Sequence, residues 1–484
     1  MSNQDAIEQI IGGFGKYQAW IFFLVTLGRF PAEIQLTNVV FVLPSVDYVC
    51  LDEGVINVTN YCPCEKPAYD QSSIVSSVTS EWDLICSREW LASLTQSILQ
   101  VGILAGSLLY GFISDRYGRK QAVVLAQFSE ALFSSISGLV PDFWMFIVCR
   151  FLIGVSLGGC MLCGYIILIE FSGKNIRAYV TGLIESIYII AYLLLPIIAF
   201  YVREWRLLQL VTSVPWLLVI SYYWLISESP RWLITVGKRD EAIRVLTNIA
   251  KFNNRPTDKI EQVVAEVEKA SMADGKEAYG TYLDLFKTPR MRLYSFVMAF
   301  IWLCCSHTFF GITQYIGRLQ GNLFLNVLLS AVTLIPGLVV VVIMSKYFKR
   351  KPVTIGSFSI SAISLLLFVF LPANPPSLRL SFAIIGSTAA YIAFVQIYLY
   401  ASEIFPTVIR NSAMGFASVF ARFGGFIAPF VVNIGIEWVS IVIFSAMAFL
   451  AAFLCIFLPE TKDIVLPNTI DQTNGKENQR NVSQ

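Results

Sequence analysis

Charged side chains inside long apolar segments are the residues of this chain best suited to chemistry. They are Arg29, Glu33, Glu130, Arg150, Glu170, Glu185, His307, Glu403 and Arg422. An ionisable group in such a segment is costly, so a function is the default reason for its presence. A guanidinium there favours a carboxylate or sulfate and repels an amine. The chain shows no paired-carboxylate, nucleophile–base or metal-ligand pattern and has a single histidine. It therefore predicts ion binding rather than an enzyme, with no cofactor and no metal.

The apolar segments are too extensive for a water-soluble protein. Of the 484 residues, 56% are hydrophobic and 14% are charged, whereas a soluble domain has about 45–50% and about 25%. Since about 20 apolar residues cross a bilayer, we expect an all-α polytopic membrane protein with about a dozen spans. These lie near 17–43, 90–114, 120–139, 143–170, 176–202, 206–227, 292–316, 321–345, 352–371, 379–402, 410–434 and 437–458. The net charge of +2 argues against nucleic acid as a partner, and the absence of a P-loop string argues against ATP.

The charges of the loops predict the orientation. The loops after the second and eighth spans are basic, whereas 44–89 is acidic, so the positive-inside rule places both termini in the cytoplasm and 44–89 outside. The expected organisation is a cytoplasmic N-terminus (1–16), a six-helix bundle (17–227), a cytoplasmic helical linker (228–291), a second bundle (292–458) and a disordered tail (459–484). Two stretches of the linker, 238–252 and 257–270, have apolar residues at helical spacing.

The outer loop contains four cysteines, Cys50, Cys62, Cys64 and Cys86. An oxidising compartment would pair them as disulfides, and three pairings are possible. A zinc site is the alternative, although Cys62-Pro63-Cys64 has the wrong spacing for one. Asn57 begins an N-glycosylation tripeptide in the same loop.

Charged motifs at the ends of the spans occur twice, about 230 residues apart. Glu170 and Arg177 match Glu403 and Arg410, the loop 115–120 matches 345–350, and Glu228 matches Glu460. Such duplication predicts a 6+6 parallel repeat, which transporters use to rock two halves about a midplane site. Surface ion pairs are worth about 0–1 kcal/mol, so pairs formed by these motifs could open in each cycle. The expected gating residues are Asp115, Arg116, Gly118, Arg119, Arg150, Glu170, Arg177, Glu228, Arg231, Glu403, Arg410 and Glu460. Positive-inside anchoring is the alternative, but it leaves the acidic partners unexplained.

Several strings resemble one family of membrane proteins. They are GFISDRYGRK (111–120), RFLIGVSLGG (150–159), YIILIEF (165–171), WRLLQL (205–210), SESPRWL (227–233), ASEIFPTVIRN (401–411) and LPETKD (458–463), with SEWDLICSREW (80–90) the most diagnostic. The sequence resembles the solute carrier 22 group of the major facilitator superfamily. The resemblance implies twelve transmembrane helices in two six-helix pseudo-repeats, a central cavity and ATP-independent alternating access in the plasma membrane. Ser345 and Phe348 depart from the family pattern, so the second gate is expected to be weaker or shifted to the 346–351 basic cluster.

The resemblance also bears on the charge of the substrate. Family members that move organic cations have an acidic residue at the position of Arg422 and a glutamate at that of Leu334, whereas anion and carnitine carriers have arginine at the former. This favours a small organic anion, or a zwitterion if Glu185 or Glu33 also faces the substrate. Glu33 and Arg29 are four residues apart and could instead neutralise each other, and Arg422 could form an interhelical salt bridge. Glu33, Glu185 or, less favourably, His307 could carry a proton.

Aromatic rings bind flat or amphipathic ligands. The expected substrate-binding residues are Arg422, Glu185, Glu33, Arg29, Gln396, Trp302, Phe309, Phe310 and Tyr398. An organic-cation carrier of the same fold and a non-transporting substrate sensor remain as alternatives.

Overall fold

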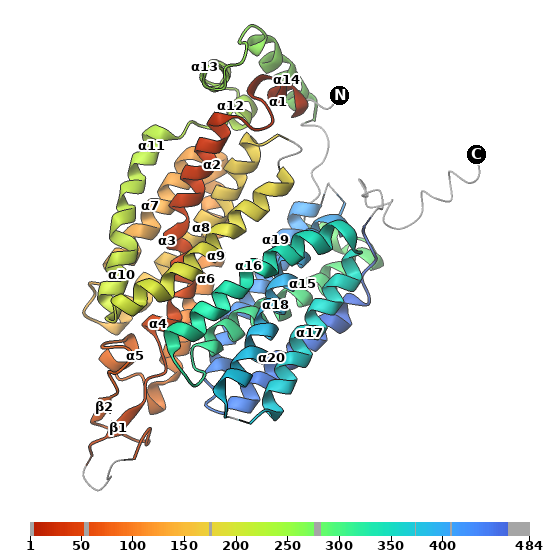
Figure 1. The fold of residues 1–484 in the computed structure, drawn as a ribbon. Coiled ribbons are helices and arrows are strands. Elements are labelled where there is room, and N and C mark those ends of the chain that lie inside the picture. The colour runs from red at the N-terminus through yellow and green to blue at the C-terminus, as the bar shows by residue number, and fades with distance from the viewer. Residues whose placement is uncertain are drawn as a thin grey trace, which may run out of the picture. The chain divides into compact units, whose positions relative to one another are not determined.

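A computed structural model describes residues 4–52, 58–173, 177–274, 282–372, 374–406 and 409–462, and these are largely helical (Figure 1). They group into two compact units. Unit 1 comprises residues 1–38, 101–198 and 204–278, and unit 2 comprises 39–100, 199–203 and 279–484. The predicted site residues before residue 279 and outside the outer loop therefore belong to unit 1, and the later ones belong to unit 2.

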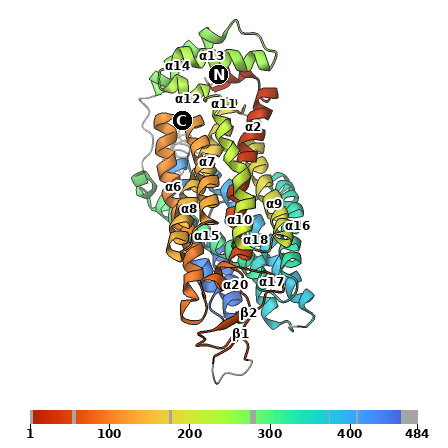
Figure 2. The ribbon, with the colours of Figure 1, turned by 90° about the vertical axis from the view of Figure 1, so that its left-hand side faces the viewer.

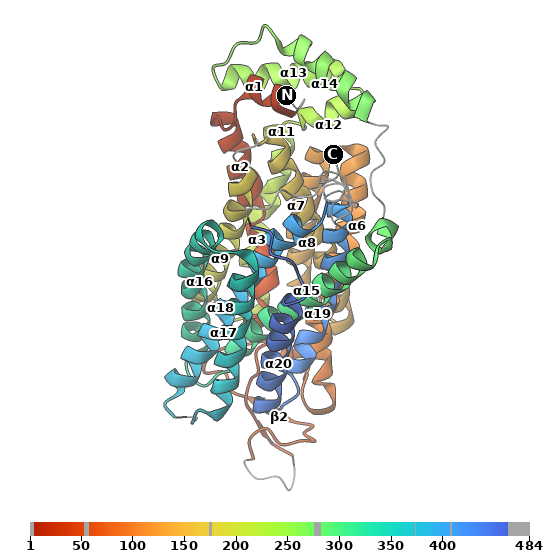
Figure 3. The same ribbon diagram turned by 90° about the vertical axis from the view of Figure 1, so that its right-hand side faces the viewer.

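Unit 1 is a helical bundle with a small helical cap. Its elements are α1 (Gln4–Ile11), α2 (Lys16–Gly28), α3 (Phe30–Thr37), most of α6 (Trp90–Tyr117), α7 (Arg119–Ser137), α8 (Phe143–Phe171), most of α9 (Arg177–Tyr201), α10 (Trp205–Ser213), η2 (Val214–Ser221), α11 (Tyr222–Leu225), α12 (Pro230–Thr235), α13 (Arg239–Phe252) and α14 (Ile260–Asp274). Helices α13 and α14 coincide with the two amphipathic stretches of the predicted linker. Figures 2 and 3 show them beside α1 at one end of the unit.

Unit 2 contains the second bundle and the outer loop. Its elements are α4 (Val39–Val42), β1 (Tyr48–Cys50), β2 (Pro67–Tyr69), α5 (Val78–Glu81), η1 (Cys86–Arg88), the first part of α6, η3 (Tyr282–Phe286), α15 (Pro289–Ile316), α16 (Leu323–Tyr347), α17 (Arg350–Phe370), α18 (Pro376–Ile404), α19 (Arg410–Val432) and α20 (Glu437–Cys455). Helix α15 packs against α18, α19 and α20, and α17 packs against α18 and α20.

Ten helices of the described residues are long and apolar enough to cross a membrane. The first predicted span and α7 complete the set of twelve. Neither is a long, uniformly apolar helix, and the structure shows why. Helix α7 turns polar residues inward, with Gln127, Glu130 and Ser134 buried. The first span, expected to be continuous over 17–43, is instead interrupted at Arg29 and Asn38. Near the first break Pro31 has no N–H group to continue the helical ladder.

The predicted span 206–227 is also not one regular helix. It consists of α10, the 3₁₀ segment η2 and α11. Pro215 is at the start of η2, where its ring conflicts with the preceding α-helical turn and it offers no backbone N–H. The hydropathy signal predicts the crossing correctly but not this change of helix type.

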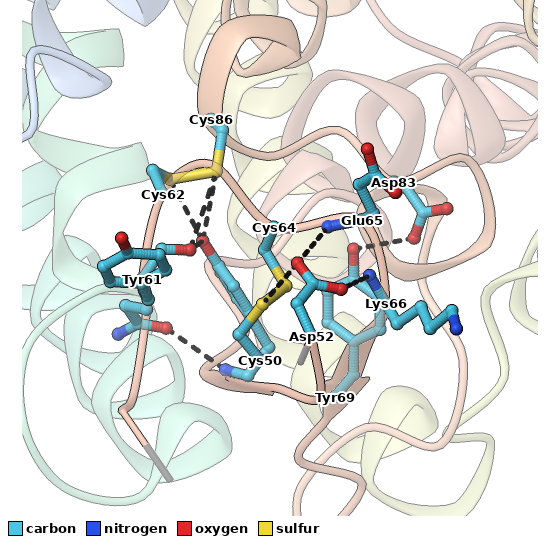
Figure 4. The surroundings of a disulfide bond; sticks show 12 residues. Cys50, Asp52, Tyr61, Cys62, Cys64, Glu65, Lys66, Tyr69, Asp83 and Cys86 are labelled. Carbon is cyan, nitrogen blue, oxygen red and sulfur yellow. Dashed lines mark hydrogen bonds between the residues drawn. A yellow bond between two sulfur atoms is a disulfide. The ribbon is translucent and has the colours of Figure 1, made fainter. Parts of the chain in front are cut away.

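The outer loop is held by two disulfides, Cys50–Cys64 and Cys62–Cys86 (Figure 4), which confirms the expectation of disulfides. Strands β1 and β2 pair antiparallel beside them, with Tyr48 opposite Tyr69. The Asp52 carboxylate accepts hydrogen bonds from the backbone N–H groups of Glu65 and Lys66 at 2.8 and 3.1 Å. Asn57 lies outside the described residues.

Candidate functional site

The N-terminus of α7 is capped by a carboxylate from a distant part of the chain. Glu228 Oε1 accepts hydrogen bonds from the N–H groups of Arg119 and Lys120 at 2.9 and 3.0 Å. The first N–H groups of a helix have no partner within the helix, and its N-terminus attracts negative charge. Gly118 has φ +117°, and a Cβ there would lie 2.2 Å from Glu228 Oε2. Glycine is therefore required for the carboxylate to reach the helix.

The Arg119 side chain joins this cap to two more acidic residues. It pairs with Asp115 at 2.6 Å and with Glu170 at 3.1 Å. Arg231 Nε donates to the Glu170 carbonyl oxygen at 3.0 Å. We call Asp115, Gly118, Arg119, Glu170 and Glu228 the first motif cluster; it connects the ends of α6, α7 and α8 to the segment before α12.

The same arrangement recurs in unit 2. Glu460 accepts hydrogen bonds from the N–H groups of Arg350 and Lys351 at 2.8 and 3.2 Å, at the start of α17. Arg350 pairs with Glu403 at 3.1 Å, and Thr461 Oγ1 donates to Glu403 at 2.6 Å. We call Ser345, Arg350, Glu403, Glu460 and Thr461 the second motif cluster. In both clusters a glutamate caps a helix while the first arginine of that helix binds a second glutamate.

The two clusters differ where their sequences differ. Ser345 replaces the aspartate of the first cluster, and its backbone carbonyl accepts from Arg350 Nη1 in place of a carboxylate. The role of the loop aspartate is thus taken by the backbone, while Arg350 of the 346–351 basic cluster makes the ion pair.

The two caps also differ in their electrostatics. Burial raises the pKa of Glu228 above its ordinary value of 4.5, although the backbone N–H donors of Ser229, Lys120 and Arg119 oppose the shift. For Glu460 burial also works to raise the pKa, but four backbone N–H donors outweigh it, so its pKa lies below 4.5.

The ion pairs in the clusters are only in part the ones that the sequence suggested. Asp115 pairs with the neighbouring cation Arg119, as expected. The sequence also paired each glutamate with the arginine seven residues later, but Glu170 and Glu403 form their ion pairs with Arg119 and Arg350, and Arg410 interacts with Glu403 only electrostatically. The side chain of Arg177 lies outside what the structure describes. Arg410 Nε and Nη2 are buried without a hydrogen-bond partner among the described residues. Arg116 is exposed near the rings of Phe112 and Tyr117.

Unit 1 also holds charges at membrane depth. Arg29 Nε lies 2.5 Å from Glu33 Oε1, as the four-residue spacing allowed, and Glu185 also interacts electrostatically with Arg29. Glu33 is buried and Glu185 half-buried. Arg150 is fully buried on α8, where its Nη1 lies 3.3 Å from Gln35 Oε1. Arg150 therefore lies in a buried polar region, apart from the first motif cluster with which the sequence had grouped it.

Unit 2 contains a continuous group of aromatic rings on α15 and α18. The Trp302 and Tyr398 rings are 4.3 Å apart, and Phe394 contacts Tyr398, Phe309 and Phe310. Trp302 and Phe309 are buried, whereas Phe310, Phe394 and Tyr398 are half-buried. Sequence reasoning missed Phe394, although it is on α18 one turn before Tyr398.

Polar groups accompany these rings. Trp302 Nε1 and Gln396 Oε1 are buried without a hydrogen-bond partner among the described residues, while Gln396 Nε2 donates to Ser345 Oγ at 2.8 Å. His307 Nδ1 lies 3.3 Å from the Gly424 carbonyl oxygen, which ties α15 to α19. Arg422 is half-buried, two residues before Gly424.

Comparison with known proteins decides the family. Residues 50–469 match the family described as sugar (and other) transporter. The chain is 31% identical to an organic cation transporter protein of Drosophila melanogaster, over 97% of this chain and 94% of that protein. It is 32% identical to solute carrier family 22 member 3 of Mus musculus, over 82% of this chain and 71% of that protein. The chain belongs to the solute carrier 22 family.

The family assignment agrees with the fold. The partially occluded inward-open structure of the xylose transporter XylE from E. coli has a TM-score of 0.66 and 20% identity, covering 93% of this chain and all of that chain. This likeness shows the fold: twelve transmembrane helices in two six-helix pseudo-repeats. As a member of the solute carrier 22 family, the protein is a multi-pass membrane transporter of the organic-ion type.

Proposed function

We propose that this protein carries small organic anions or zwitterions across the plasma membrane by alternating access, with both termini in the cytoplasm. The observation that carries the proposal is Arg422, half-buried in the middle of the apolar segment Ser412–Val432. A guanidinium at membrane depth is costly, so a function is the default reason for its presence. Its planar fork matches a carboxylate. Arg422 therefore binds the acidic group of the substrate.

The aromatic group of unit 2 suits the rest of such a substrate. Phe310, Phe394 and Tyr398 offer half-buried ring faces, and Trp302 and Gln396 add a donor and an acceptor. Apolar walls with a few polar atoms are typical of small-molecule sites. An aromatic carboxylate is thus the expected minimal ligand.

The motif clusters serve as the gating elements in this proposal. Each motif cluster holds a partly buried arginine between hydrogen-bond acceptors, and these contacts stabilise the assembled cluster. The acceptors belong to separate segments of the chain, and these segments can move apart. Alternating access needs conformational states that lie within a few kcal/mol of one another. A small number of such contacts is therefore sufficient to stabilise one state over another.

An organic cation is the second candidate substrate. Two observations favour it. In unit 1, the two carboxylates Glu33 and Glu185 interact with the single guanidinium of Arg29. In addition, a relative is named an organic cation transporter protein. In this case Glu33 and Glu185 would bind the substrate and Arg422 would be structural.

Labelled uptake of three size-matched aromatic substrates, an anion, a zwitterion and a cation, distinguishes the candidates. The proposal predicts uptake of the anion or zwitterion, its loss in Arg422→Ala, and its retention in Arg244→Ala, which removes an exposed arginine on α13. Surface expression is measured for each variant. Uptake of the cation, unchanged or improved in Arg422→Ala, would favour the second candidate, and tight binding without flux would indicate a sensor.

A further inference from the structure

Glu130 is a buried ionisable residue that the preceding account leaves unused. It is on α7, midway between the two ends of the helix, and its side chain is completely buried. Ser134 Oγ donates to Glu130 Oε1 at 2.9 Å. Glu130 Oε2 has no hydrogen-bond partner among the described residues.

The surroundings of Glu130 do not neutralise a negative charge. The charged residue with which it interacts is another carboxylate, Glu33, and Cys160 on α8 is a further electrostatic neighbour. Arg29 is bound to Glu33 and also interacts with Glu185. Arg29 thus interacts with Glu33 and Glu185, whereas Glu130 interacts with Glu33, and burying unpaired charge is strongly unfavourable.

The charged residues on the other helices packed against α7 contact other groups. On α8, Arg150 contacts Gln35, and on α10, Arg206 donates to the Gly138 carbonyl oxygen beyond the end of α7. Tyr223 of α11 lies near Lys120 at the opposite end. The remaining ionisable groups of these elements are Tyr222 on α11, Cys149, Cys163, Tyr165 and Glu170 on α8, and Arg119 on α7 itself.

A second buried acceptor lies one turn before Glu130. Gln127 Nε2 donates to the Val25 carbonyl oxygen at 2.9 Å, while Gln127 Oε1 has no partner among the described residues. A Cβ on Gly28 would lie 2.4 Å from Gln127 Oε1, so the amide is packed tightly against the break in the first span. Little space therefore surrounds Gln127 Oε1, one turn from Glu130, and a proton is the positive charge that needs none.

We propose that Glu130 is a proton-binding residue, and that its proton is exchanged during the transport cycle by way of the carboxylates Glu33 and Glu185, while Arg29, which interacts with both, keeps its protons. Glu185 is partly exposed within unit 1 and Glu130 is not, so these carboxylates lead from the exposed part of the unit to its interior. The exchange step rests on the proposed transport function; proton binding by Glu130 does not.

Infrared difference spectroscopy of the purified full chain tests proton binding without any substrate. The wild type should show the C=O band of a protonated carboxyl group at neutral pH. Glu130→Gln, which mimics the neutral side chain, should lose the band, and Glu65→Gln, an exposed control in the outer loop, should keep it. Ser134→Ala removes a donor that favours the charged form, so the titration of the band should shift to higher pH.

A wild type without the band, or a band retained in Glu130→Gln, would overturn the proposal, as would a band that sodium ions displace at constant pH. Uptake then tests the exchange step: the pH dependence of wild-type uptake should be lost in Glu130→Gln. If no probe substrate is transported, the proposed function fails, while the infrared result still decides the proton site.

Discussion

Replacing Glu460 with alanine should loosen the beginning of α17. The Glu460 carboxylate accepts hydrogen bonds from the N–H groups of Arg350 and Lys351. Losing a side-chain cap costs about 1 kcal/mol, and losing a negative charge at a helix N-terminus costs about 0.5 kcal/mol. Water can replace the bonds to Thr461 and Lys462, which belong to the loop that Glu460 itself begins. The opening free energy should thus fall by about 1.5 kcal/mol.

Cys455 offers a direct readout of this opening. It is fully buried on α20, which packs against α17, and Lys351 Nζ donates to the neighbouring Ile456 carbonyl oxygen at 2.7 Å. A change of 1.4 kcal/mol is tenfold in an equilibrium constant. Thiol labelling of Cys455, measured by peptide mass spectrometry under conditions of rapid reclosing, should therefore accelerate about tenfold in Glu460→Ala.

Glu228→Ala supplies the reciprocal control. It should accelerate labelling of the buried Cys163 on α8, whose Sγ lies 3.5 Å from the Tyr110 carbonyl oxygen, and leave Cys455 unchanged. The capping account would be refuted if Glu460→Ala left Cys455 labelling within about twofold of the wild-type rate. Equal acceleration of both cysteines by either variant would also refute it, since the effect would then be global.

Two further predictions concern the outer loop and pH. Replacing Cys62 and Cys86 together with serine opens a loop of sequence separation 24, which should lower the unfolding free energy by about 3.5 kcal/mol; an unchanged denaturation midpoint would contradict this. The raised pKa of Glu228 contributes stability that is present below its ordinary value of 4.5 and lost as the pH rises through the folded-state value. The lowered pKa of Glu460 does the reverse, with stability present above 4.5 and lost as the pH falls through the folded-state value. Thermal unfolding should therefore be measured for each variant across the acidic range. As the pH rises, the stability difference between the wild type and Glu228→Gln should shrink, and that between the wild type and Glu460→Gln should grow. Parallel curves of stability against pH for the two variants would contradict the difference between the caps.

Much of the fold is readable from the sequence because lipid exposure imposes long apolar runs. The predicted span 143–170 corresponds to α8 (Phe143–Phe171), and 379–402 lies within α18 (Pro376–Ile404). The break at Arg29 and the 3₁₀ segment η2 were missed because hydropathy does not report backbone geometry. The prolines near both sites, Pro31 and Pro215, were the available signal.

The candidate site was predictable only in part. The charged motif residues were identified from their duplication, but the ion-pair partners of Glu170 and Glu403 were not. Arg350 was missed as the partner of Glu403 because matching the loop 115–120 to 345–350 places Lys349 opposite Arg119, whereas in the structure Arg350 begins α17 as Arg119 begins α7. Which residues meet across the bundle depends on tertiary packing, which a single sequence does not reveal. For Glu403, the seven-residue spacing suggested Arg410, whereas its ion pair is with Arg350.

Charge recognition by Arg422 is tested most directly with an aromatic carboxylate and its uncharged amide, compared as substrates of the wild type and of Arg422→Gln. A hydrogen bond to a charged group is worth about 1.5–3 kcal/mol, so the wild type should prefer the carboxylate by at least about tenfold in uptake efficiency. Arg422→Gln should abolish this preference while still transporting the amide. A preference that persists in Arg422→Gln, or a wild type that prefers the amide, would contradict the assignment of Arg422 as the residue that binds the substrate's acidic group.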